Sequence, residues 1–169
     1  MVKYMKYVNS ALSHGASNAV AVKPGDIVFD GRTILKCMFG CGTWGKGCMC
    51  PSREGFLSTD DYEKLLKKYK AVIIVHSPDK KIAQKASFEV EKEAFFDGDV
   101  MAFSTSDCAI CAECAGGDNE PCRHVMMARP SFHSVGIDVF ATAKKHGMPI
   151  EVLRTTDEQE NWYAAVWLN

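Results

Sequence analysis

The strongest hydrophobic pattern in the sequence lies in residues 71–104. The apolar run AVIIV (71–75) is rich in β-branched residues and predicts a buried strand. A helical pattern begins at Ser77-Pro78-Asp79, with Ser77 as the cap, and ends at Asp97-Gly98, after which VMAFS (100–104) predicts a second strand. A strand, a helix and a strand in this order predict one parallel βαβ unit, whose strands would end at the same edge of a sheet.

Weaker patterns on both sides predict the remaining elements. Apolar residues at helical spacing follow Ser58 and Thr59, either of which can cap that helix. The other expected elements are a short helix over 3–13, two strands around the Asp30-Gly31 turn in 26–38, a helix from Pro130-Ser131 to Gly147, and strands over 150–153 and 163–168. We therefore expect an α/β (α+β) fold with a mixed β-sheet, flanking helices and a single metal-binding domain over residues 1–169.

Composition and charge narrow the classes of function. The composition is that of an ordinary globular protein, with 47% hydrophobic and 24% charged residues. The net charge of -1, from 20 basic and 21 acidic residues, argues against a protein that binds nucleic acid mainly through charge. The N-terminus has no apolar stretch of signal-peptide length, and no run approaches the ~18 apolar residues of a membrane span. We therefore expect a cytoplasmic protein that binds neither nucleic acid nor a membrane.

The eight cysteines fall into two groups, four within residues 37–50 and four within 108–122. In a reducing compartment, cysteines at this density are more often metal ligands or redox groups than disulfides. The second group follows the predicted strand at 100–104, at the edge where His76-Ser77 would end the other strand of the unit. This placement predicts cysteine-rich, metal-binding loops at one edge of the sheet.

The second group has the more specific spacing. Cys108, Cys111 and Cys114 form C-x-x-C-x-x-C, and Cys122 follows after seven intervening residues. Three thiolates at this spacing can wrap one side of a four-iron cluster, and the triplet is the front part of the bacterial ferredoxin run C-x2-C-x2-C-x3-C-P. The spacing therefore predicts ligands of an iron–sulfur (4Fe-4S) cluster, with zinc as the alternative metal.

The first group contains Cys37, Cys41, Cys48 and Cys50, and its four thiols could fill a second site. One of Cys48 and Cys50 can be a spare. The Cys50-Pro51 pair is similar to the remote fourth ligand of two-cluster ferredoxins, so an arrangement in which Cys50 joins the second group stays open.

A nucleotide site is the competing interpretation of the same stretch. Gly40 and Gly45-Lys46 approach the phosphate-binding pattern G-x-x-x-x-G-K-[ST]. Gly47 occupies the position of the Ser or Thr that would bind magnesium, and Pro51 falls where a helix should begin. We reject the nucleotide interpretation, because these glycines suit a loop that bends tightly to bring thiols together.

Several residues around the cysteines have a second interpretation. His124 can bind metal or donate to a sulfur, but it also fits a solvated loop. His133 is expected to be structural, beside apolar neighbours on the last helix. The basic residues Lys46, Arg123 and Arg129 would offset the negative charge of a cluster, with ordinary surface charge as the alternative. The aromatic residues Trp44 and Phe39 would shield the first site from water, with a place in the core as the alternative.

Three segments together resemble a known family. They are KCMFGCGTWGKGCMCP (36–51), CAICAECAGGDNEPCRH (108–124) and ARPSFHSVGIDV (128–139). They are similar to the domain-of-unknown-function family described as predicted metal-binding proteins, found mostly in anaerobic bacteria and archaea, over about residues 20–150. The resemblance implies metal binding but no established reaction. The ligands it implies are Cys37, Cys41, Cys50, Cys108, Cys111, Cys114 and Cys122.

The chain departs from the family pattern at three points. Ser52 stands where the family usually has a second proline, Cys48 is an addition, and His124-Val125 replaces a residue pair that usually ends in proline. These departures leave the implied ligand set intact. They leave the role of Cys48 open.

Taken together, the patterns predict an iron–sulfur protein with one or two four-iron clusters that exchanges electrons with a redox partner protein. A structural zinc protein that presents a binding surface is the first alternative. A cluster-dependent enzyme with one iron left open for substrate is the second, since seven ligands leave one iron of two such clusters without a thiolate. Whether the protein is an enzyme stays open, and so does a homodimer.

Overall fold

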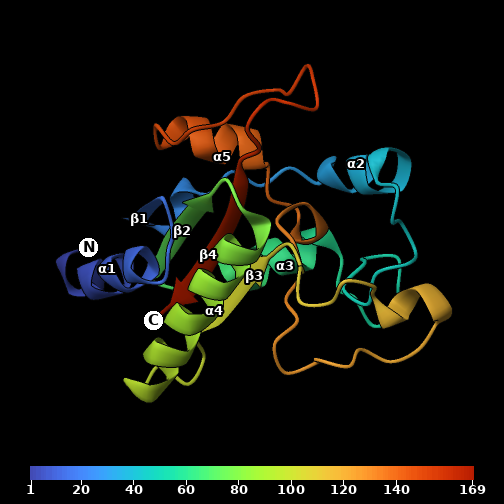
Figure 1. The fold of residues 1–169 in the computed structure, drawn as a ribbon. Helices are drawn as coiled ribbons and strands as arrows, with labels where there is room; N and C mark the ends of the chain where they lie inside the picture. The colour runs from blue at the N-terminus through green and yellow to red at the C-terminus, as the bar shows by residue number, and fades with distance from the viewer.

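The computed structural model describes residues 1–169, and its centre is a four-stranded antiparallel sheet (Figure 1). The strands lie in the order β1-β2-β4-β3. Their bounds are Asn18–Val22 for β1, Ala71–Ser77 for β2, Phe103–Ser106 for β3 and Trp162–Leu168 for β4. With five α-helices around this sheet, the expected mixture of helices and sheet is confirmed.

The parallel pair expected from the βαβ pattern is not formed. Strand β4 lies between β2 and β3 and pairs antiparallel with both, for example through Ile74 opposite Ala165 and Ser104 opposite Val166. A continuous apolar run shows that a strand is buried on both faces, but it does not show which strand will be its neighbour. Because β2 and β3 are both antiparallel to β4, they still run in the same direction and finish at the same end of the sheet.

Helices cover both faces of the sheet, which explains why β2 is apolar at almost every position. On one face, α1 (Met5–Ser13) and α4 (Lys80–Phe96) pack on Ile73, Val75 and Val166. The other face packs Ile74 and Trp167 against α3 (Thr59–Leu66), α5 (Val139–Lys145) and the 3-10 turn η4 (His133–Val135). None of the helices combines the length and apolar character needed to cross a membrane.

Side-chain caps fix where three of these helices begin. Ser58 Oγ accepts a hydrogen bond from the N–H of Asp61, as expected for the start of α3. The cap of α4 is Asp79 instead of Ser77, because the Asp79 carboxylate reaches the first free N–H groups of the helix. Asp138 caps α5 in the same way.

Three expectations for the outer segments are wrong, and one strand was missed. Residues 26–38 contain no pair of strands: a single bridge at Phe29 is followed by helix α2 (Thr33–Gly40), which starts where Asp30 accepts hydrogen bonds from Arg32. The helix expected from Pro130-Ser131 is interrupted at Gly136, whose φ of +85° ends η4 before α5 begins. The segment 150–153 has no regular structure, and β1 was not expected. The remaining short turns are η1 (Val2–Tyr4), η2 (Pro24–Asp26) and η3 (Ala115–Asp118).

Candidate metal centre

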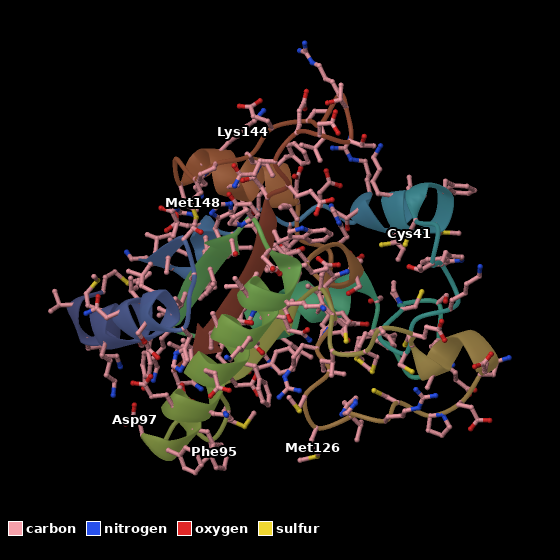
Figure 2. All side chains as sticks on the ribbon, in the orientation of Figure 1. Cys41, Phe95, Asp97, Met126, Lys144 and Met148 are labelled. Carbon is pink, nitrogen blue, oxygen red and sulfur yellow. The ribbon has the colours of Figure 1, made fainter.

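All eight cysteines line one cavity of about 730 Å³, at the side of the molecule where β3 ends. Two loops form it: one continues from α2, and the other runs from the end of β3 through η3 (Figure 1). Figure 2 shows sulfur atoms gathered where these loops lie, with Cys41 at the end of α2. Every cysteine is a free thiol. The structure therefore brings together two groups of cysteines that are about 60 residues apart in sequence.

The two loops are joined by Arg53 and by a close backbone contact at Gly116. Arg53 Nε donates to the carbonyl of Gly47 at 2.9 Å, and its Nη2 donates to the carbonyl of Gly116 on the other loop. A Cβ on Gly116 would lie 2.7 Å from Cys48 N, from Lys46 O and from Arg53 Nη2. Only a residue without a side chain allows the loops to approach this closely.

The second loop is anchored at both ends on α4. At its start, Gln84 Oε1 accepts the N–H of Ala109 at 2.7 Å. At its end, Arg129 pairs with Glu91, whose carboxylate also accepts the N–H of Ser104 at 2.7 Å. Helix α4 thus connects the sheet to the loop that carries four cysteines.

Within the first group, Cys37 interacts electrostatically with Cys41 and Cys50. Burial raises the pKa of the Cys37 thiol to about 11, and three neighbouring groups add to the shift through their negative charge: Cys41, Cys50 and Asp107. Burial also opposes ionisation of Cys50. Hydrogen bonds with Ser52 Oγ at 3.1 Å and from Gly45 N at 3.2 Å outweigh this, so the pKa of Cys50 is lowered.

Cys48 interacts with two cysteines of the second group, Cys114 and Cys122. The N–H of Cys48 donates to Cys114 Sγ at 3.3 Å, and this bond contributes most to lowering the pKa of the Cys114 thiol. Burial raises the pKa of Cys48 to about 11, with further contributions from Cys114 and Cys122. Cys48 therefore comes from the first segment of the sequence but lies with the second group, whereas Cys50 stays beside Cys37. The hydrogen bond from Cys48 to Cys114 joins the two cysteine segments.

The donor set fits a metal bound by thiolates, but its spacing does not fit one ion. Thiolates are soft ligands that select zinc, copper(I) or iron–sulfur clusters. No three His, Cys, Asp or Glu side chains lie close enough together to hold one metal ion. A structural zinc site needs four ligands at about 2.0–2.3 Å from one point. The eight thiols instead line one cavity together.

A family model described as "Predicted metal-binding protein (DUF2284)" matches residues 20–168. The chain belongs to this family. Comparisons with curated proteins and with solved structures found no match. The resemblance indicated by the three motifs is confirmed, and it extends to the last strand of the sheet.

Basic residues exceed acidic ones around the cavity of this DUF2284 protein. Of the cations expected near a cluster, Lys46 and Arg123 line the cavity. Arg129 also lines it, but its charge is already paired with Glu91. Lys80 and Lys81 of α4 add positive charge, and the acidic lining residues are Asp107 and Glu113. This balance suits a thiolate-ligated group, which carries negative charge.

The other singled-out residues separate into those at the cavity and those away from it. Trp44 and His124 line it, and the His124 backbone N–H donates to Cys122 Sγ at 3.4 Å. Phe39 is neither a shield nor part of the core, since it is 83% exposed on α2. His133 lies outside the cavity, and its carbonyl accepts the Thr33 hydroxyl at 3.0 Å. His76 is buried and contacts Asn161 at 2.8 Å, away from the cysteines.

Sequence reasoning missed the residues that assemble the cavity. Arg53, Gly116, Gln84 and Glu91 bind no metal themselves, and each acts through a partner 13 or more residues away. The sequence carries no periodic or spacing signal for such contacts.

Proposed function

We propose that this protein is a cytoplasmic iron–sulfur protein that holds one or two four-iron clusters in the cysteine cavity and exchanges single electrons with a partner protein. The observation that carries the proposal is the placement of eight free thiols around one cavity of about 730 Å³. In a four-iron cluster each thiolate binds a different iron, so the sulfurs stand around the cluster instead of converging on one point. Eight thiols around one cavity are more than the four that one structural zinc ion uses, and three of them follow the C-x-x-C-x-x-C spacing that begins the bacterial ferredoxin run.

The protein's own groups would have three roles toward a cluster. The thiolates of both groups would bind it. Backbone N–H groups already directed at sulfur, from Cys48 to Cys114 and from Gly45 to Cys50, would stabilise the anionic ligands. The unpaired cations Lys46 and Arg123 would favour the reduced, more negative state and so raise the reduction potential. The cluster itself would supply the electron-accepting chemistry.

Anaerobic spectroscopy tests this function. The protein purified without oxygen should be brown, its visible absorption should fall when dithionite is added, and the reduced form should give an electron paramagnetic resonance signal. Reoxidation by a one-electron acceptor should restore the absorption. A colourless protein, or a coloured one that does not respond to dithionite, would contradict electron transfer and leave a zinc-stabilised module as the better account.

A further inference from the structure

Helix α2 carries an apolar stripe that no other part of the chain covers. Leu35, Met38 and Phe39 are spaced at i, i+3 and i+4, so they share one side of the helix. They are 49%, 43% and 83% exposed, and Figure 1 shows α2 at the outer edge of the molecule, away from the sheet. A helix of eight residues is marginally stable in water, and a contiguous exposed apolar surface marks a site of contact. We therefore expect another molecule to cover this stripe.

The other side of the same helix faces the cysteine cavity. Cys37 lines the cavity, and so does Cys41, which directly follows the helix. Residues two positions apart on a helix point to nearly opposite sides, so Phe39 points away from the thiol of Cys37. A protein docked on the apolar stripe would be separated from the thiols by little more than the width of one helix, about 10 Å. Electron transfer between two proteins requires an approach of this kind.

The charge of this segment indicates the chemistry of the molecule that covers it. Residues 31–53 contain four basic residues and no carboxylate: Arg32, Lys36, Lys46 and Arg53. Arg32 is paired with Asp30, and Arg53 donates to two backbone carbonyls. Lys36 and Lys46 are exposed and form no ion pair. Carboxylates on a partner would complement these two lysines.

A second copy of this chain fits the surface less well than an acidic partner does. In a two-fold symmetric dimer the same surface of each copy meets the other. Lys36 and Lys46 would then lie against the same lysines of the second copy, without a carboxylate from residues 31–53 between them. Like charges brought together in this way oppose association.

We propose that α2 and the loop after it dock an electron-transfer protein whose contact surface has an apolar centre and carboxylates around it. This inference rests on the proposed iron–sulfur function, since it assigns the class of partner to that centre. Leu35, Met38 and Phe39 form the apolar centre of the interface, and Lys36 and Lys46 form its charged rim. In each encounter the reduced cluster loses one electron, and the oxidised redox group of the partner gains it. Redox complexes are small and transient, so the charges act mainly on the rate of association.

The test uses one electron acceptor in two forms of opposite surface charge. These are cytochrome c, which is basic, and cytochrome c with succinylated lysines, which is acidic. The protein is purified without oxygen, reduced with dithionite, freed of excess reductant and mixed with each oxidised cytochrome in a stopped-flow instrument. At low salt, we expect the acidic form to be reduced at least roughly tenfold faster than the basic form. Added salt should slow the reaction of the acidic form and accelerate that of the basic form.

Two variants separate the apolar and the charged part of the surface. Phe39→Ala and Lys36→Glu should each slow the reduction of the acidic cytochrome roughly tenfold. Phe96→Ala is the control for the first, because Phe96 is 84% exposed at the last position of α4. Lys68→Glu is the control for the second, at an exposed lysine just beyond the end of α3. Both controls should react at the native rate. Iron and sulfide are measured in every variant, and rates are expressed per cluster.

The proposal is overturned if F39A and K36E react at the native rate, or if the basic cytochrome is the faster acceptor at low salt. Flotation with vesicles of phosphatidylcholine and phosphatidylserine that is lost in F39A would assign the surface to a membrane instead. A dimer that F39A dissociates would assign it to a second copy. Protein without iron or sulfide would refute the proposed function. The surface is then tested by titration of the metal-free protein with succinylated cytochrome c, where equal affinities of the native protein and K36E exclude it.

Discussion

Gly116→Ala should deprive the protein of roughly half or more of its metal. The new Cβ would lie 2.7 Å from two backbone atoms, Cys48 N and Lys46 O, neither of which can move without shifting its loop. Overpacking of this kind costs about 1–3 kcal/mol. The clash is removed most simply if the two loops separate. Separation would break the hydrogen bond from Cys48 N–H to Cys114 Sγ and weaken the one from Arg53 to the Gly116 carbonyl. Iron per chain after anaerobic purification measures the effect.

Gly117→Ala provides a close control for this substitution. Gly117 lies in the same turn, η3, but a Cβ there would meet nothing within 4 Å. We expect G117A to keep the native metal content and a melting temperature near the native one. Native metal content in G116A would show that contact between the loops is not what forms the centre.

Glu91→Ala should lower the free energy of unfolding by about 3 kcal/mol, because it leaves the Arg129 guanidinium buried without its partner. The two side chains are only 14% and 12% exposed. Arg129 also packs over the rings of Phe88 and Phe103, so it cannot easily turn to solvent. Loss of the carboxylate also removes the acceptor for the N–H of Ser104. Denaturant unfolding of the metal-free protein measures this change without a contribution from metal binding.

The matched control is Glu89→Ala. Glu89 lies two residues before Glu91 on α4 and also forms an ion pair. Glu89 pairs with Lys92, whose side chain is 45% exposed, and exposed pairs of this kind contribute about 0–1 kcal/mol. E89A should therefore change the stability by less than a third as much as E91A. Equal effects of the two substitutions would mean that the Glu91–Arg129 pair does not anchor the second loop.

The helices and strands with strong local signals were predictable from sequence, whereas the sheet order was not. Ser58 and the apolar spacing after it located α3, and the runs at 71–75 and 163–168 located β2 and β4. The insertion of β4 between β2 and β3 depends on a pairing between segments about 90 residues apart. The hydrophobic pattern shows that a strand is covered on both faces. It does not show whether the neighbouring strand runs parallel or antiparallel.

Short apolar segments were the least predictable. The residues after Asp30-Gly31 form α2, although the sequence pattern favours a hairpin. Asp30 binds the N–H and the side chain of Arg32, and buried Thr33 bonds to the carbonyl of His133. These contacts start a helix whose apolar residues stay largely exposed. The sequence therefore has no buried helical face that hydrophobic periodicity could detect.

The gathering of cysteines could be inferred from their clustering, but not which cysteines are neighbours. Cys48 and Cys50 are two residues apart, and the structure directs them to different groups. Lys46 and Cys48 lie against Gly116, next to Cys114, whereas Cys50 Sγ bonds within its own loop, to Gly45 N and Ser52 Oγ. Spacing alone contains no information about a partner in a distant loop.

Quantification of iron, acid-labile sulfide and zinc in protein purified and analysed without oxygen tests the central claim most directly. If the cysteine cavity holds four-iron clusters, each chain should contain about four or eight iron atoms, an equal amount of sulfide and little zinc. Stoichiometric zinc without sulfide, or a fully folded protein that takes up no iron during anaerobic reconstitution, would contradict the account.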